Sequence, residues 1–195
     1  MDRREALKRV GMLMGGALSA STIAGVMGGC RPGPTTEPFV PETITGGQND
    51  LVTTITELIS PETDTPGARA ARVNEFIDRM LTDWFKDDER AHFLAELATV
   101  DTKAQDAYSK PFLDLTPEQQ TELLSAMEEE GLAWMEALGT GAADPEKPPF
   151  FNLIKQLTLA GYYTSEIGGS QELRDMPIGE YRGDVPFQEI GRAWS

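Results

Sequence analysis

Few side chains in this sequence have the types and spacing that catalysis requires. The chain has 195 residues but only one cysteine, Cys30, and one histidine, His92. These counts exclude an intramolecular disulfide and every zinc site built from several cysteine and histidine ligands. A Ser-His-Asp triad would have to use His92, and no GxSxG nucleophile elbow is present. A lone histidine beside Phe93 and Leu94 in a predicted helix is typical of a packing or surface residue.

Paired carboxylates are the remaining hydrolytic chemistry, because glycoside hydrolases place two acidic side chains beside the scissile bond. Acidic residues are plentiful here, but their spacing singles out no pair. An alternative function is a free-standing exported lipoprotein that hydrolyses glycans. Its catalytic carboxylates would have three nominal candidates: Asp64, Asp114 and Glu166. This reading stays open as an alternative.

A sugar-binding module is a second alternative, because indole rings can stack on pyranose rings. The chain has three tryptophans, Trp84, Trp134 and Trp194. Trp84 and Trp134 lie in predicted helices, where the apolar pattern places them in the core.

Cofactor and metal motifs are also missing from the sequence. There is no GxGxxG fingerprint, no P-loop and no CxxCH haem motif. The run Glu128-Glu129-Glu130 is best explained as a solvated helix face, because adjacent helical residues point in different directions. We therefore expect no catalytic, cofactor-binding or metal-binding residues on this chain.

The charge of the chain limits its partners. The formal net charge is −15, and the first 29 residues hold four basic and two acidic side chains, so the remainder carries −17. Phosphate binding needs clustered lysine and arginine, so this balance excludes nucleic acid as a ligand. An acidic body suits a basic partner or a well-solvated surface.

The stretch 150–169, FFNLIKQLTLAGYYTSEIGG, is the helix around which the others are expected to pack. It follows Pro148-Pro149 and ends at Gly168-Gly169, which are typical helix boundaries. Six residues at helical spacing form one apolar stripe: Phe150, Leu153, Ile154, Leu157, Ala160 and Gly161. Further apolar residues occupy its other faces, so this helix must be covered on more than one side. It is either the central helix of a small domain or a helix that partly faces a second protein.

Glycine at position 161 is unfavourable in a helix interior, where it costs about 1 kcal/mol relative to alanine. We expect Gly161 to allow another backbone to approach closely.

Two helices are predicted before residue 85 from their apolar periodicity and caps. The first begins at Asp50, with Asn49 or Asp50 as its cap, and ends before Pro61. The second begins at Pro66, with Thr65 as its cap. The second has the clearest amphipathic pattern in the chain, carried by Val73, Phe76, Ile77, Met80, Leu81 and Trp84.

Three more helices are predicted between residues 87 and 138. The first covers 87–97 and opens with acidic residues that suit the helix dipole. A short segment, 101–109, is expected to be capped by Asp101. A long helix then follows a capping box, with Thr116 as cap, Pro117 next and Gln119 at the third position, and bends at Gly131.

These patterns predict an all-α fold, a small irregular helical bundle. The expected organisation is a signal over residues 1–30, a Pro/Gly-rich linker over 31–49, the helical domain over 50–176 and an irregular tail over 177–195. The tail carries Tyr181, Phe187 and Trp194, which are too apolar for a free tail and are expected to pack along the body or a partner.

The first thirty residues resemble an export signal. Arg3-Arg4 matches the twin-arginine pattern, and the following apolar run to Met27 is weakened by glycine and serine, unlike a stable membrane span. Cys30 follows Gly28-Gly29, as in a lipobox, so we expect it to be lipidated and to anchor the protein. Cleavage nearby and a retained, uncleaved signal remain alternatives. The expected location is periplasmic and membrane-attached.

Several stretches together resemble the gluconate 2-dehydrogenase subunit 3 family. They are the leader with Arg3-Arg4, the loop PETDTPGA over 61–68, NEFID over 74–78, the helix 150–168, and PIGEYRG over 177–183. The resemblance covers roughly residues 50–187, and the stretch FFNLIKQLTLAGYYTSEIG is its specific part.

The resemblance implies a small, non-catalytic subunit of a membrane-associated sugar dehydrogenase. In such complexes the large subunit is a FAD-dependent flavoprotein of the glucose–methanol–choline type, and a cytochrome c with haem often accepts the electrons. The small subunit carries the export signal and helps the flavoprotein to fold and assemble. Related sets oxidise gluconate, glucose or the 3-hydroxyl of glucosides. Where the family often has a cysteine after the Tyr-x-Gly of the tail, this chain has Asp184, so contact there is expected to be non-covalent.

Aromatic and apolar residues of the helix and tail are the expected interface with that flavoprotein, because aromatic anchors contribute most to such contacts. They are Phe150, Phe151, Tyr162, Tyr163, Ile167, Tyr181 and Phe187. Packing of the helix residues inside the chain's own core is the alternative.

Overall fold

The computed structural model describes residues 39–173, 183–191 and 193. The predictions for Arg3, Arg4, Cys30, Tyr181 and Trp194 lie outside these described residues. The regular elements in the described part are all helical, which confirms the all-α prediction. They are α2 (Gly46–Ile59), α3 (Val73–Asp83), α4 (Asp87–Tyr108), η1 (Phe112–Asp114), α5 (Pro117–Gly139), α6 (Phe150–Tyr163), η2 (Gly168–Glu172) and α7 (Phe187–Ile190).

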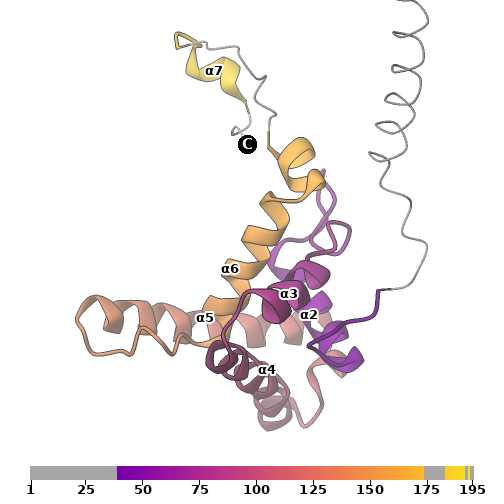
Figure 1. The fold of residues 1–195 in the computed structure, drawn as a ribbon, viewed down its shortest axis with the longest axis vertical. Coiled ribbons are helices and arrows are strands. Elements are labelled where there is room, and N and C mark those ends of the chain that lie inside the picture. Colours follow the sequence, from indigo (N-terminus) through magenta and orange to yellow (C-terminus); the bar gives the residue numbers. More distant parts are fainter. Residues whose placement is uncertain (1–38, 174–182, 192, 194–195) are drawn as a thin grey trace, which may run out of the picture. The chain divides into compact units, whose positions relative to one another are not determined.

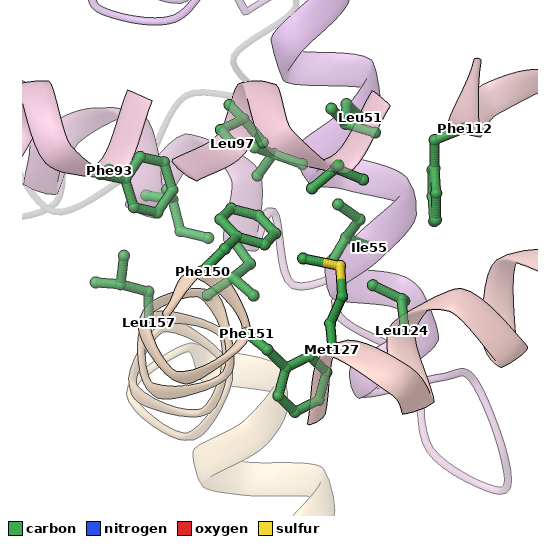
Figure 2. Packing of buried hydrophobic residues seen from close by; sticks show 14 of the residues in the cluster. Leu51, Ile55, Phe93, Leu97, Phe112, Leu124, Met127, Phe150, Phe151 and Leu157 are labelled. Carbon is green, nitrogen blue, oxygen red and sulfur yellow. The ribbon is translucent and has the colours of Figure 1, made fainter. Parts of the chain in front are cut away.

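Helix α6 lies at the centre of the folded body and packs against α2, α3, α4 and α5 (Figure 1). The core between these helices is apolar, and Figure 2 shows part of it. Its largest fully buried side chains include Phe93, Phe112, Phe150, Ile55 and Ile154. The prediction that α6 is covered on more than one side is confirmed.

The helical body begins earlier than the predicted linker boundary at residue 49. Helix α2 starts at Gly46, and its capping box is formed by Thr45 and Gln48 rather than by Asn49 or Asp50. Ile44 is only 3% exposed and belongs to the core. The prediction of a linker up to residue 49 is therefore wrong at its end. The two glycines between Thr45 and Gln48 are typical of a linker, but here they lie in the first turn of the helix that this capping box begins.

The second helix, by contrast, begins later than predicted. Thr65 does not cap it, and α3 starts only at Val73 after Arg72, which adopts the left-handed conformation with φ 56°. The Glu57 side chain, in the last turn of α2, holds the preceding loop. The Glu57 carboxylate accepts hydrogen bonds from the backbone N–H groups of Glu62 at 3.1 Å and Arg69 at 2.8 Å. This tertiary support explains why a Thr-Pro pair typical of a helix start forms a loop here.

Residues 87–108 form one continuous helix instead of the two predicted segments. Asp101 lies inside α4, where its carboxylate accepts the backbone N–H of Phe112 at 2.9 Å and so begins η1. The capping box at Thr116, by contrast, is confirmed with Pro117 at the start of α5. Gly131 is buried in α5 at a place where a Cβ would meet the Asn152 side chain of α6.

Helix α6 ends at Tyr163, five residues before the predicted boundary at Gly168. Ser165 accounts for the break: its hydroxyl donates to the carbonyl of Tyr162 at 2.6 Å and accepts the N–H of Gly168 at 3.0 Å. A short π-helical turn, η2, follows. Gly168 is required there, because a Cβ would lie 2.0 Å from the Tyr162 carbonyl oxygen.

Candidate functional site

The start of α6 is fixed by contacts with α4 and α5. Pro149 precedes the helix, and the N–H of Phe150 donates to the Glu96 carboxylate of α4 at 3.1 Å. The Asn152 amide donates to the carbonyl of Gly131 on α5 at 3.3 Å, which uses the space that glycine leaves. These contacts determine which face of α6 is turned inward.

Glycine at position 161 makes room for a ring rather than for a backbone. A Cβ there would lie 2.6 Å from Cδ1 of Phe76, on α3. The close approach predicted for Gly161 is therefore present, but its partner is an aromatic side chain.

Three of the predicted interface residues belong to the core. Phe150, Phe151 and Tyr162 are 1%, 8% and 3% exposed. Phe150 packs against Phe93 with ring centroids 5.9 Å apart, and the Tyr162 hydroxyl donates to the carbonyl of Pro66 at 2.8 Å. These residues cannot offer a face to a partner while the fold is intact, because the chain's own helices already cover them. Figure 2 shows Phe150 and Phe151 among the packed core side chains.

Two of the predicted interface residues remain accessible on or after α6. Tyr163 is 42% exposed, and Ile167 is half-buried. Leu159, one helical turn before Tyr163, is 39% exposed and extends the same face. We call Leu159 and Tyr163 the α6 apolar face.

Of the tail residues, Phe187 begins α7, but its side chain lies outside the described part of the chain.

The second half of α5 carries another pair of exposed apolar side chains. Leu132 is 63% exposed and Met135 is 52% exposed, although both continue the apolar spacing of this long helix. Figure 1 explains this, because that end of α5 and the return loop extend beyond the other helices of the body. The apolar spacing of α5 therefore continues past the part of the helix that packs against the core.

A groove beside the end of α3 is the feature that sequence reasoning missed. Trp84, predicted to lie in the core, is 76% exposed and lines a groove of about 500 Å³. The groove lies between the α3–α4 turn, the first turns of α4, the loop 145–148 and α6. It is lined by Trp84, Phe85, Lys86, Asp88, Glu89, His92, Pro145, Glu146, Lys147, Pro148 and Leu153.

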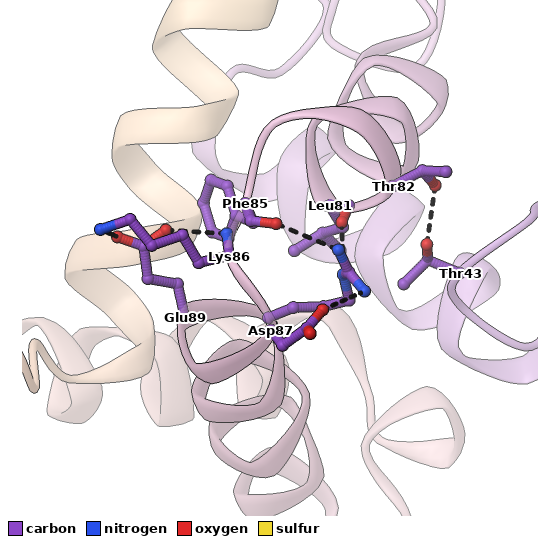
Figure 3. A network of polar contacts seen from close by, with 8 residues as sticks. Thr43, Leu81, Thr82, Phe85, Lys86, Asp87 and Glu89 are labelled. Carbon is purple, nitrogen blue, oxygen red and sulfur yellow. Dashed lines mark hydrogen bonds and ion pairs between the residues drawn. The ribbon is translucent and has the colours of Figure 1, made fainter.

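Arg90 holds the turn that carries Trp84. Its Nε donates to the carbonyl of Leu81 at 2.6 Å, and its Nη2 donates to the carbonyl of Phe85 at 3.0 Å (Figure 3). Its Nη1 is 3.2 Å from the Asp87 carboxylate. One guanidinium therefore binds a carbonyl in the last turn of α3 and a carbonyl of the turn that follows it, on either side of Trp84.

The nominal hydrolase carboxylates do not form a protected site. Asp64, Asp114 and Glu166 are all exposed, and they come from the 61–72 loop, η1 and the turn after α6. A general acid in a glycosidase needs a desolvated environment that raises its pKa. Within the residues that the structure describes, no three His, Cys, Asp or Glu side chains are grouped to hold a metal ion.

The shifted pKa values also have local structural causes. A hydrogen bond from the Tyr108 hydroxyl to Glu122, at 2.9 Å, is the main reason that the pKa of Tyr108 is raised. At the start of α5, a backbone hydrogen bond and then the Thr116 hydroxyl lower the pKa of Glu118. Neither residue lines the Trp84 groove.

Comparison with known families decides the identity of the helical body. The sequence model of the family described as gluconate 2-dehydrogenase subunit 3 matches residues 47–182. The chain belongs to the gluconate 2-dehydrogenase subunit 3 family. No curated protein and no solved structure matched it.

The family match has a clear structural counterpart. It begins within the first turn of α2 and includes every helix of the described body through η2. The subunit 3 domain is therefore the bundle around α6. Membership in a family of dehydrogenase subunits is consistent with a small subunit of a dehydrogenase complex.

Proposed function

We propose that this chain is the non-catalytic small subunit of a FAD-dependent sugar dehydrogenase complex. Its partner is a flavoprotein of the glucose–methanol–choline type, in a complex of the gluconate 2-dehydrogenase or glucoside 3-dehydrogenase kind. The small subunit assists folding and assembly of that flavoprotein. FAD is bound by the partner, and a cytochrome c with haem c is the third member of the complex.

The observation that carries this proposal is the α6 apolar face on a chain of the subunit 3 family. Leu159 and Tyr163 are 39% and 42% exposed, one helical turn apart, on the helix that the other helices surround. Burying a large apolar side chain against a partner is favourable by roughly 1.5–3 kcal/mol. The chain after residue 29 carries a net charge of −17. Complementary basic groups on the flavoprotein would therefore increase the rate at which the two proteins associate.

Export completes the proposed role. Arg3 and Arg4 direct the chain, with its bound flavoprotein, through the twin-arginine route, and lipidation of Cys30 attaches the complex to the periplasmic side of a membrane. Among the helices that the structure describes, none combines the length and hydrophobicity that crossing a bilayer requires. Acyl chains contribute about 0.8 kcal/mol per buried CH₂, so multiple chains on one cysteine give stable attachment.

Co-expression with the flavoprotein encoded by a neighbouring gene tests the proposal. The wild-type chain should co-purify with the flavoprotein and raise its soluble, FAD-loaded yield. The double variant Leu159→Asp/Tyr163→Asp should lower co-purification at least tenfold. Leu113→Asp is the matched control, because Leu113 is 43% exposed but lies on η1.

The outcomes separate clearly. An unchanged yield of FAD-loaded flavoprotein, with no co-purification, would contradict the subunit role. If the wild type and the double variant bind equally, the α6 apolar face is not the interface. If Leu113→Asp is as damaging as the double variant, the effect is on folding or charge rather than on this face.

A further inference from the structure

We propose that the groove beside Trp84 is a binding site for a neutral saccharide, with the indole of Trp84 as its stacking platform. The site differs from the α6 apolar face in position and chemistry. Its test uses this chain alone, so its failure would leave the proposed subunit role untouched.

The walls of the groove are held in place before any ligand binds. Arg90 fixes the turn that carries Trp84 through the carbonyls of Leu81 and Phe85. On the opposite wall, His92 Nε2 lies 2.9 Å from the carbonyl oxygen of Pro148, and this contact fastens the 145–148 loop to α4. A preformed site avoids part of the ordering cost of binding.

The apolar part of the groove suits a flat ring. Trp84 is 76% exposed, the most exposed aromatic side chain among the described residues, and Phe85, Leu153 and two prolines line the same space. A volume of about 500 Å³ lies within the range of small-molecule sites, about 300–1,000 Å³. This is enough space for a sugar of one or two rings.

The polar part of the groove carries both signs of charge. Lys86 and Lys147 supply donors, and Asp88, Glu89 and Glu146 supply acceptors. Lys86 Nζ and the Glu89 carboxylate lie 3.8 Å apart and are exposed, so a ligand can compete for them. Asp88 and Lys147 also line the groove, and the described part of the chain places no side-chain partner on either of them. Sugar hydroxyls both donate and accept, so they match such an interleaved set.

Ligands of high charge fit this set less well. The five charged residues of the groove have a net charge of −1, on a body that is itself strongly acidic. A carboxylate or phosphate ligand would meet three acidic side chains, and a basic peptide would meet two lysines. A neutral ligand avoids both costs, and its affinity should change little with salt.

The test is an NMR titration of the full purified chain with methyl β-D-glucopyranoside and with maltose, following the indole N–H signal of Trp84. The signal is assigned by comparison with Trp84→Phe. We expect a saturable shift that persists when salt is raised from about 0.05 to 0.5 M. Gluconate, an anion of similar size, should bind at least tenfold more weakly.

Two substitutions make the titration specific. Trp84→Ala should weaken saccharide binding at least tenfold, measured on the ligand signals by saturation transfer. Because Trp84 is largely exposed, its removal should leave the fold intact, which circular dichroism checks. Trp134→Phe, on the half-buried tryptophan of α5, should bind like the wild type.

Several results would overturn the proposal. They are the absence of a saturable shift with either saccharide, equal binding by the wild type and Trp84→Ala, or binding that disappears in high salt. If the saccharides fail but the flavoprotein shields the Trp84 signal, the groove is a protein contact and not a sugar site.

Discussion

The carboxylate of Asp78 accepts a hydrogen bond from the backbone N–H of Ile44 at 3.0 Å, across 34 positions of sequence. The same carboxylate accepts the N–H groups of Glu42 at 2.8 Å and Thr43 at 3.0 Å. Asp78 is only 2% exposed, so three consecutive donors enclose a buried carboxylate. This arrangement fastens the segment that precedes α2 to the middle of α3.

Asp78→Ala should therefore destabilise the fold. The substitution leaves three backbone donors without an acceptor, and each buried unsatisfied donor costs about 1–3 kcal/mol. Some of these donors will reach water when the segment detaches, so we expect a loss of about 2–4 kcal/mol in the free energy of unfolding. Urea denaturation followed by circular dichroism measures it. Asp83→Ala, at the exposed end of the same helix, is the control and should change stability by less than about 0.5 kcal/mol. Equal effects of the two variants would show that the Asp78 contacts contribute nothing specific.

The contacts of Asp78 illustrate why sequence patterns reach only part of this fold. Helix periodicity and local caps found α5 and its capping box at Thr116, because these signals lie within a few residues of one another. A carboxylate that binds backbone groups more than thirty residues away leaves no such pattern. Asp101 is a milder case: its spacing predicts a helix cap, but its carboxylate accepts the N–H of Phe112, 11 positions away, and so begins η1.

The candidate site shows a different limit. Periodicity identifies apolar side chains that must be covered, but it does not say whether the chain itself or a partner covers them. Phe150 and Tyr162 are covered by the chain, whereas Tyr163, the next residue along α6, is 42% exposed. Trp84 continues the spacing of α3, yet the helix ends at Asp83 and the side chain turns outward. Only the packed structure separates these cases.

Gly161→Ala should destabilise the body although alanine favours helices. The new Cβ would lie 2.6 Å from Cδ1 of Phe76, so the ring or the helix must shift. Overpacking of this kind costs about 1–3 kcal/mol. Because the better helix propensity of alanine returns only about 1 kcal/mol, we expect a net loss of stability. Gly139→Ala in α5 is the matched control, because nothing lies within 4 Å of its Cβ position, and it should be neutral or stabilising. Thermal unfolding of both variants gives the comparison; a stabilised Gly161→Ala would contradict the tight contact.

Replacing Arg3-Arg4 with Lys-Lys should block export of the chain and of the flavoprotein that we propose as its partner. The arginine pair is the feature that the leader shares with twin-arginine signals. Replacing both arginines with lysines tests whether the guanidinium groups are needed, because the net charge stays the same. Cell fractionation with immunoblotting measures the exported share. Cys30→Ser is the companion variant: it should still be exported but should leave the membrane fraction. Normal export of the Lys-Lys variant would remove the basis for a twin-arginine signal.

Removal of the Glu122 carboxylate should lower the pKa of Tyr108 toward its ordinary value near 10. In the folded chain that pKa is raised, first by the hydrogen bond that the Tyr108 hydroxyl donates to Glu122, then by burial and by the repulsion between the carboxylate and a phenolate. A raised folded-state pKa means that this contact stabilises the fold below the unfolded pKa and that the contribution is lost as pH rises through the folded value. Carbon NMR titration of the tyrosine rings in Glu122→Ala should show one ring, Tyr108, titrating at lower pH than in the wild type. Glu129→Ala, an exposed acidic residue on the same helix, should leave that ring unchanged. If Glu122→Ala moves no tyrosine, the hydrogen bond between α4 and α5 does not persist in solution.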